Sequence, residues 1–232
     1  MSVTAFVPPL RRVNWKPCYR IIPSRFPPIQ LFERVADPGD LEAVFAVEAL
    51  TNTRIREEVG ELQLVAPEDR VSGEGSSWIL APFTHVSAPG GRFSTPEFGA
   101  YYASRKLETA IEETKYHRAR FMAYTGEPPM EIDMRVLRAN LSGRLHDVRG
   151  LGRSHPELYD GTDYTASQAL ARRLRAVNSW GILYDSVRHA GGECAAVLRP
   201  RALARCRQAQ HLSYVWGGAS ITHVYEKRRL KL

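Results

Sequence analysis

Apolar residues recur every three or four positions in three stretches of the chain, which is the spacing of a helix with one buried face. Glycine or proline stands at the end of the first two stretches, where it would stop a helix. The third stretch begins with threonine and has glutamine three residues later, the pattern of a capping box. The pattern predicts helices over residues 41–59 and 106–124 and from Thr165 onward, with Ser104 as the N-cap of the second.

Other stretches are short, apolar and rich in aromatic or β-branched residues, or alternate apolar and polar positions, as strands do. Gly191–Gly192 marks a turn between two of them and predicts a hairpin. Helices come mainly in the first three quarters of the chain and strands cluster at its end. This order favours an α+β fold with mixed or antiparallel sheets and flanking helices over a doubly wound parallel sheet. The predicted strands cover residues 18–22, 61–71, 98–103, 130–136, 141–148, 180–187, 194–199, 211–216 and 221–225.

The size and composition of the chain are those of an ordinary globular protein. It has 232 residues, of which 44% are hydrophobic and 25% are charged, close to globular averages. No apolar run approaches the about 18 residues that a membrane helix needs, and the first charges follow the apolar part, unlike those of a secretory signal. We therefore expect a cytoplasmic protein without membrane contact. Three prolines fall within residues 1–17, for which we expect an irregular lead-in.

The cysteines give no support to metal or disulfide chemistry. Cys18, Cys194 and Cys206 are an odd, scattered set without a C-x-x-C pair, so neither a zinc site nor a disulfide framework is indicated, and we expect no metal. The net charge of +7 is compatible with a nucleic acid, an anionic small ligand or an acidic partner. Charge alone does not choose among these three.

Candidate chemistry gathers between residues 90 and 117, a stretch that reads as loop, strand and helix. A glycine pair lets the backbone approach a ligand closely, and Arg92 follows it directly. The strand then supplies Tyr101–Tyr102, and the helix start supplies Glu112–Glu113. One local unit would thus bring polar groups to a small pocket. The alternative is ordinary structure, with a surface loop, core tyrosines and an acidic pair that complements the helix dipole.

A second polar group lies at the end of the predicted strand 180–187, where Ser186 and Arg188 precede the glycine hairpin. A nucleophilic serine would need an adjacent base and usually a G-x-S-x-G elbow, which is absent here. A hydroxyl that orients a ligand is the better functional interpretation. A serine that caps the turn remains the alternative.

Five short motifs occur in a fixed order along the chain. They are Y-R-I at 19–21, G-G-R-F at 90–93, G-A-Y-Y-A-S at 99–104, T-A-I-E-E at 109–113, and Y-D-S-V-R followed by G-G at 184–192. Together they resemble the RES domain family, which is named for an arginine, a glutamate and a serine. Members of that family are toxins of bacterial toxin–antitoxin pairs. The resemblance spans about residues 18 to 200.

The resemblance implies a fold similar to that of ADP-ribosyltransferase toxins, with NAD bound as substrate in a cleft. It also implies cleavage of the nicotinamide–ribose bond by water or by phosphate. By position, Arg20, Glu113 and Ser186 match the three name-giving residues, and Arg92 and Tyr102 match further pocket positions. The implied catalytic residues are Glu113, Arg92 and Tyr102, and the implied NAD-binding residues are Arg20, Arg92, Tyr102 and Ser186.

The residue types suit this chemistry. Loss of nicotinamide builds positive charge on the ribose, as in glycoside hydrolysis, and one carboxylate can stabilise that charge. Arginine presents a rigid fork to pyrophosphate, and a tyrosine face can stack on nicotinamide. Adjacent helical residues diverge by about 100°. We place Glu113 rather than Glu112 toward the pocket because Ala110, Thr114 and His117 share its side, and we assign His117 a structural role.

Two features depart from the family pattern. Ser94 stands where many relatives have asparagine, and a long segment separates Arg20 from Arg92. We interpret about residues 30–85 as an added helical segment that covers the cleft or serves a partner. The predicted organisation is a lead-in over residues 1–17 and a RES-like catalytic domain over residues 18–232.

The resemblance also implies a partner, a helix-turn-helix antitoxin whose acidic segment would meet the basic surface of this chain. Nucleic acid would then be contacted only indirectly, and a homodimer is compatible with the sequence. A first alternative is ADP-ribosyl transfer to a macromolecule, although the chain has adjacent glutamates rather than a Glu-x-Glu motif. A more distant one is a basic nucleic-acid-binding module, based on the net charge and on Arg172, Arg173 and Arg175.

Overall fold

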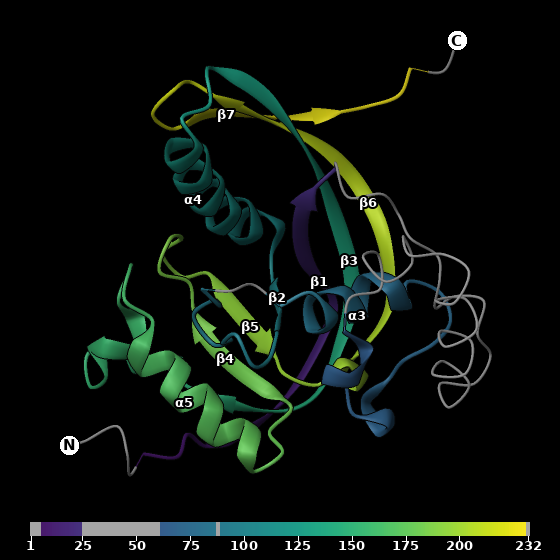
Figure 1. Cartoon of the computed structure of the whole chain (residues 1–232), viewed down its shortest axis with the longest axis vertical. Coiled ribbons are helices and arrows are strands. Elements are labelled where there is room, and N and C mark those ends of the chain that lie inside the picture. Colours follow the sequence, from purple (N-terminus) through teal and green to yellow (C-terminus); the bar gives the residue numbers. More distant parts are fainter. Residues whose placement is uncertain (1–5, 25–60, 87–88, 231–232) are drawn as a thin grey trace.

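The computed structural model describes residues 6–24, 61–86 and 89–230. In these ranges the strands form one seven-stranded sheet in the order β1-β2-β5-β4-β3-β6-β7. Strand β1 also pairs with β3, so five strands close into a ring, from which β6 and β7 extend (Figure 1). The strands are β1 (Leu10–Pro23), β2 (Tyr101–Ser104), β3 (Met130–Asp147), β4 (Gly181–Asp185), β5 (Glu193–Val197), β6 (Leu203–Trp216) and β7 (Ile221–Lys227).

The sheet is mixed because one of its pairings is parallel. Strand β3 runs parallel to β4, and the chain between them contains helix α5 (Thr165–Ala176), as a parallel connection requires. The other pairings are antiparallel, including the predicted hairpin of β4 and β5 around Gly191–Gly192. The predicted α+β class, with a mixed sheet and flanking helices, is confirmed.

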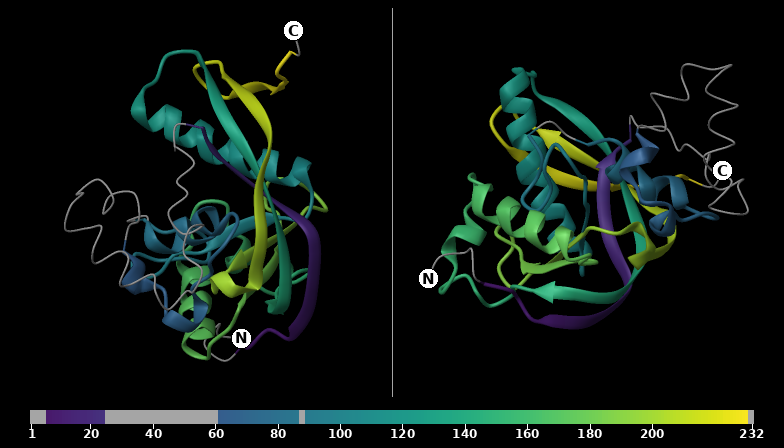
Figure 2. Two further views of the ribbon diagram at one scale, coloured as in Figure 1. Left: turned by 90° about the vertical axis from the view of Figure 1, so that its right-hand side faces the viewer. Right: turned by 60° about the horizontal axis from the view of Figure 1, so that its bottom comes forward.

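Three helices of the described residues pack on different parts of this sheet. Helix α4 (Leu107–Thr125) buries Ala110 and Met122 against β3, β6 and β7. Helix α5 covers β4 and β5 (Figure 1), and α3 (Ser76–Thr84) packs against β6. Both views of Figure 2 show the long strands β3 and β6 side by side, as their pairing requires. Short 3-10 helices lie at Leu62–Leu64, Pro67–Asp69, Pro156–Tyr159 and Pro200–Ala202.

Strand β1 corrects the prediction for the start of the chain. Residues 10–17 are not irregular but form the first part of this strand. Pro17, which lacks a backbone N–H, lies at a register shift between Trp15 and Cys18. A proline is tolerated at such a bulge because no ladder hydrogen bond is needed there. Pro17 therefore marks an irregularity inside a strand rather than the absence of one.

Strand β3 corrects a second prediction. Residues 130–136 and 141–148 were predicted as separate strands, whereas Met130–Asp147 is one continuous strand. Gly143 lies inside it, and a Cβ there would come within 2.7 Å of the Trp180 ring. This glycine admits a neighbouring side chain. The predicted gap at residues 137–140 coincides with two register shifts against β6, between Arg135 and Leu137 and between Arg138 and Asn140, which disturb the alternation without ending the strand. The predicted strand 61–71 is also wrong, because two 3-10 helices occupy that stretch.

Helix α4 matches its prediction closely, and its C-terminal Gly126 adopts the left-handed conformation with φ of 67°. Ser104, however, is not its N-cap but a buried residue of β2. The capping box predicted for α5 is likewise absent, since its N-cap residue is Tyr164, which makes no side-chain capping hydrogen bond. The predicted helix 41–59 lies outside the described residues. Of the predicted 30–85 segment, the described part contains α3 and two 3-10 helices.

Candidate active site

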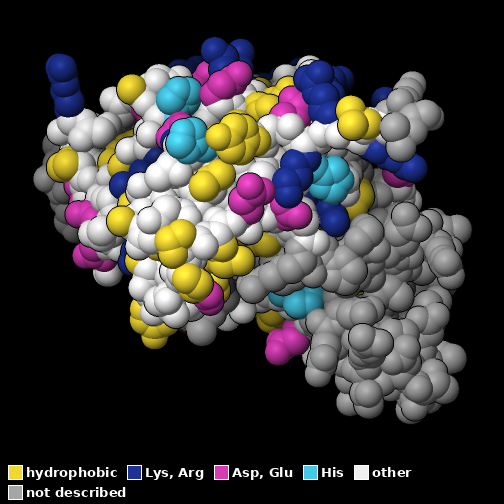
Figure 3. Space-filling view, turned by 90° about the horizontal axis from the view of Figure 1, so that it is seen from above, with side chains coloured by type: hydrophobic (Ala, Val, Ile, Leu, Met, Phe, Trp, Pro, Cys, Tyr) yellow, Lys and Arg dark blue, Asp and Glu magenta, His cyan; other side chains and the backbone are white. Residues whose placement is uncertain are grey.

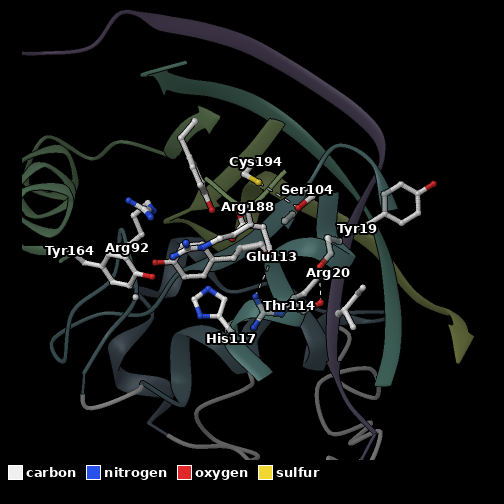
Figure 4. Close-up of a pocket in the computed structure, with 16 residues that line it drawn as sticks. Tyr19, Arg20, Arg92, Ser104, Glu113, Thr114, His117, Tyr164, Arg188 and Cys194 are labelled. Carbon is white, nitrogen blue, oxygen red and sulfur yellow. Dashed lines mark hydrogen bonds between the residues drawn. The ribbon is translucent and has the colours of Figure 1, made fainter. Parts of the chain in front are cut away.

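A cavity of about 250 Å³ opens between α4, β1, β2 and the loop that precedes β2 (Figure 4). Four of the predicted site residues line it, each from a different element. Ser186, the fifth predicted residue, is not among the residues that line the cavity, but it bonds to Glu113, which is. The structure therefore brings all five residues together, while their roles remain predictions. They are Arg20 on β1, Arg92 in the loop, Tyr102 on β2, Glu113 on α4 and Ser186 after β4.

The carboxylate of Glu113 is held by the hydroxyl of Ser186. Ser186 Oγ accepts the backbone N–H groups of Arg188 at 3.1 Å and His189 at 3.0 Å. Its own proton is thus left to donate to Glu113 Oε1, which lies 2.6 Å away. Glu112 instead pairs with Lys115 on the surface of α4, at 2.9 Å. Glu113 is therefore the carboxylate of this pair that lines the cavity.

The connection between β4 and β5 is fastened to the start of α4, which aligns Ser186 with Glu113. Thr109 Oγ1 lies 2.9 Å from His189 Nδ1. A Cβ at Gly192 would approach Thr109 Cγ2 to 2.6 Å, so only glycine allows this close packing. The glycine pair of the sequence motif thus determines how closely the serine-bearing loop approaches the helix.

Three arginines line the cavity, and their surroundings are alike. Each guanidinium donates to a backbone carbonyl and lies over a tyrosine ring, and among the described residues none forms an ion pair with a carboxylate. Carbonyls and ring faces orient a cation without neutralising it. The sets are Arg20 with Tyr102 O at 3.2 Å and the Tyr101 ring at 4.8 Å, Arg92 with Leu158 O at 2.9 Å and the Tyr164 ring at 4.8 Å, and Arg188 with Gly161 O and the Tyr116 ring at 3.4 Å.

Burial has consequences for the charge at these positions. Arg92 is only 8% exposed, and burial lowers the pKa of Arg20 from its usual value. A buried cation has lost its hydration shell and is therefore stabilised most by an anion placed directly next to it. An anion that enters the cavity would supply that partner to groups already held in place.

Tyr102 is tied to the glycine loop by its hydroxyl group. This hydroxyl accepts the N–H of Phe93 at 2.8 Å and lies 3.1 Å from Ser94 Oγ. Burial raises the pKa of Tyr102 to about 12, so the hydroxyl stays protonated at neutral pH. A Cβ at Gly91 would lie 2.7 Å from the same hydroxyl. Ser94, the departure from the family pattern, therefore contacts Tyr102.

Sequence reasoning missed several groups around the cavity. Tyr164, the residue immediately before α5, lines the cavity, and no sequence motif indicated this role. Gln168 donates to Gly91 O at 3.0 Å and so holds the loop against α5, in place of the predicted capping box. Arg188 and His117, to which no ligand role was assigned, also line the cavity. Arg188 could have been suspected because it follows Ser186 by two residues.

Two absences hold for the described part of the chain. It contains no group of three or more His, Cys, Asp or Glu residues that could hold a metal ion. None of its helices is long and apolar enough to cross a membrane. Cys18, Cys194 and Cys206 are free and buried.

Comparisons with known proteins cover most of the chain. The family model described as RES domain matches residues 67–217. The protein named "Uncharacterized protein y4oC" of Sinorhizobium fredii (strain NBRC 101917 / NGR234) is 32% identical over 212 residues, which are 89% of this chain and 86% of that protein. A similar solved structure is that of the M. tuberculosis MbcT–MbcA toxin–antitoxin complex, with a TM-score of 0.44 and 16% identity, over 90% of this chain and 88% of that one.

Proposed function

The chain belongs to the RES domain family, and we propose that it cleaves the nicotinamide–ribose bond of NAD as the toxin of a toxin–antitoxin pair. One observation carries this proposal. Across one cavity, Glu113 faces three guanidinium groups, and among the described residues it is the one carboxylate that lines this cavity and none of the three has a carboxylate partner. Such a distribution of charge suits a ligand with an anionic part and a reacting centre that becomes positive.

The charges of NAD correspond to those of the cavity wall. Its pyrophosphate carries two negative charges, for which arginine is the preferred side chain because its planar fork bonds two oxygens at once. Its nicotinamide ring carries one positive charge. The cavity offers Arg20, Arg92 and Arg188 for the first and Glu113 for the second.

The size of the cavity indicates which half of the dinucleotide it would take. Its volume of about 250 Å³ is below the range of about 300–1,000 Å³ typical of sites for whole small molecules. The nicotinamide–ribose half suits this volume, with the adenosine half outside the mouth. Tyr102, Tyr164 and Tyr184 add aromatic surface to the wall, which favours a planar heterocycle.

Glu113 would act on the charge that develops during cleavage. The bond between the ribose carbon and the nicotinamide nitrogen breaks, and its electron pair leaves with nicotinamide, which becomes neutral and needs no acid. Positive charge then spreads over the ribose, as in glycoside hydrolysis. A carboxylate already oriented by Ser186 stabilises this charge without having to reorganise. Water or phosphate then bonds to the ribose carbon.

The two alternatives receive less support from the structure. ADP-ribosyl transfer by a pair of carboxylates lacks its second member, because Glu112 pairs with Lys115. The three arginines of α5 do not form one free surface, since Arg172 pairs with Glu97, Arg173 bonds to the Phe6 carbonyl and Arg175 lies over the Phe98 ring. Figure 3 shows basic and acidic side chains interspersed on one face of the molecule.

An antitoxin remains the proposed partner of this chain. We propose that a helix-turn-helix antitoxin blocks the mouth of the cavity, and that nucleic acid is reached only through it. An acidic segment would be attracted by the guanidinium groups that line the cavity. Co-purification with the neighbouring gene product, and loss of NAD cleavage in the complex, would test this assignment.

Release of free nicotinamide from NAD, with and without phosphate, tests the proposed activity. Replacing Glu113 by Gln should lower the rate about 10²–10³-fold, the usual cost of removing one such electrostatic group. Glu112→Gln is the matched control, because it changes the neighbouring carboxylate that faces away, and it should retain nearly the full rate. Absence of nicotinamide release by the wild type under both conditions would contradict the proposed activity.

A further inference from the structure

His117 lies one helical turn after Glu113, on the same side of α4, and lines the cavity at its exposed mouth. Residues four apart on a helix are neighbours, about 5–6 Å between their Cβ atoms. Figure 4 shows the imidazole beside the space that Glu113 and Arg20 also face. The ring packs edge to face on Tyr116, with 5.4 Å between centroids. It makes no hydrogen bond to another residue of the described part of the chain, so its nitrogens are available to a ligand.

The surroundings of His117, first burial and then nearby charges, favour the neutral form of its imidazole. Partial burial of the ring against the cavity wall has the largest effect and lowers its pKa from the ordinary value of 6.5. Arg188, Arg120 and Arg92 lower it further, and Glu113 opposes them. Arg120 and Glu113 are on α4, Arg188 is on the β4–β5 connection and Arg92 is on the loop before β2. Tyr116, which packs on the ring, is an uncharged titratable neighbour, and Tyr164 lines the same cavity. At pH 7 the imidazole therefore has an unprotonated nitrogen.

We propose that His117 is a catalytic general base that takes the proton of the water that attacks the ribose. This role rests on the proposed cleavage of NAD. The electron pair of the glycosidic bond leaves with nicotinamide, and a lone pair of the water oxygen forms the new bond to the ribose carbon. The proton of that water passes to the unprotonated nitrogen of His117 and then to solvent. ADP-ribose and nicotinamide are the products.

Glu113 is the poorer candidate for this proton. Its Oε1 already accepts the hydrogen bond of Ser186, which makes this oxygen less available to take a proton from water. A protonated Glu113 would also no longer stabilise the positive ribose. The two neighbours on α4 thus divide the work, as pairs of titratable groups in active sites commonly do. Glu113 keeps its charge, and His117 moves the proton.

Partitioning of the cleaved NAD tests this role. After cleavage, the positive ribose can react again with nicotinamide or can be captured by water. Without the base, capture by water slows and return is favoured. In phosphate-free buffer, His117→Gln should lower net hydrolysis about 100-fold, near the lower end of the range for a general base. Exchange of isotope-labelled nicotinamide into NAD, relative to hydrolysis, should rise at least about 10-fold. This ratio does not depend on the folded fraction of the variant.

Two further measurements separate a base from a structural residue. Azide carries no proton to remove, so it should restore nicotinamide release in His117→Gln and yield the azide adduct of ADP-ribose. Wild-type hydrolysis should fall as the pH drops below the pKa of His117, because the imidazole then becomes protonated, and the variant should lack this limb. His223→Gln, a change of the same kind at an exposed position of β7, should behave like the wild type.

The outcomes distinguish failure of this role from failure of the proposed activity. An unchanged exchange ratio with no response to azide would overturn the role of His117, whether hydrolysis is slowed or not. A wild type that cleaves NAD with phosphate but never with water would overturn it too, and would leave the proposed activity intact. A wild type that neither releases nor exchanges nicotinamide would overturn the activity and the role together.

Discussion

Two cavities of this molecule have similar volumes but differ in whether their arginines are paired with carboxylates of the protein. The cavity at Glu113 measures about 250 Å³, and a second, which we call the Asp69 cavity, measures about 230 Å³. Both are lined by arginines and carboxylates, Glu113 in the first and Glu68 and Asp69 in the second. In the Asp69 cavity the protein supplies the counter-charge, because Asp69 pairs with Arg199 at 2.8 Å and with Arg201 at 3.0 Å. In the Glu113 cavity the carboxylate pairs with a serine, and the arginines bond to carbonyls.

The difference shows that missing counter-charge, and not the number of arginines, distinguishes the proposed ligand site. A buried cation is costly unless an anion lies next to it. Where the fold provides the anion, as at Asp69, the cluster can stabilise the structure. Where the fold provides only orienting groups, as at Glu113, a ligand can provide the anion. Three experiments below, each with a control, test the charges and hydrogen bonds that the two cavities use for stability and for binding.

The largest of these three effects is expected at the Asp69 cavity. Asp69 is 6% exposed, and Asp69→Ala would remove the carboxylate that pairs with both Arg199 and Arg201, leaving Arg199 the more distant Glu68 at 3.7 Å. Breaking a buried ion pair costs about 3–5 kcal/mol, and we expect about 3 kcal/mol because Arg201 is 34% exposed. Urea unfolding measures this loss. The rate of nicotinamide release per folded molecule should not change. A large loss of that rate would contradict the conclusion that the Asp69 cavity serves stability rather than catalysis.

An exposed ion pair provides the control for that experiment. Glu74 pairs with Arg207, and both side chains are about two-thirds exposed, at 66% and 64%. Glu74→Ala should change the free energy of unfolding by less than about 1 kcal/mol, because exposed pairs contribute little. A similar loss for both variants would show that the burial of Asp69 has no special importance.

Lysine in place of arginine should separate the two cavities through opposite measurements. Arg92→Lys keeps the charge but loses the planar fork, and the loss of one charge-assisted hydrogen bond should raise the KM for NAD about 10-fold. Arg199→Lys should lower the unfolding free energy and leave KM unchanged, because Arg199 faces Asp69. Steady-state kinetics and urea unfolding of both variants provide the check. A rise in KM for both would contradict the assignment of binding to one cavity.

The smallest effect concerns high pH. Burial raises the pKa of Tyr102 to about 12, above its unfolded value of about 10. The folded state therefore binds more protons between these values, and stability is lost as the pH rises through this window. Between pH 8 and pH 11, the wild type should lose about 1 kcal/mol more unfolding free energy than Tyr102→Phe. The exposed Tyr225, at 54%, is the control, and Tyr225→Phe should follow the wild type.

Local sequence patterns were sufficient for some elements of the fold. Helix α4 was predicted almost to its ends because its apolar spacing and its terminal Gly126 both act within a few residues. The hairpin of β4 and β5 followed from one glycine pair for the same reason. The continuity of β3 could not be read in this way. The predicted gap at residues 137–140 lies where the pairing with β6 shifts register, between Arg135 and Leu137 and between Arg138 and Asn140, and this irregularity depends on a strand from a distant part of the chain.

The sequence by itself determined the fold class, the family and five residues that the structure brings together, four of them lining one cavity. It did so because helix and strand periodicity and the order of short motifs are local properties of the chain. Only the tertiary structure decided that Glu113 bonds to Ser186, 73 positions away, and that Arg20 is held by the Tyr102 carbonyl, 82 positions away. It also added Tyr164, Arg188 and His117 to the wall. Partners so distant in sequence meet only through strand pairing and helix packing, which no local pattern specifies.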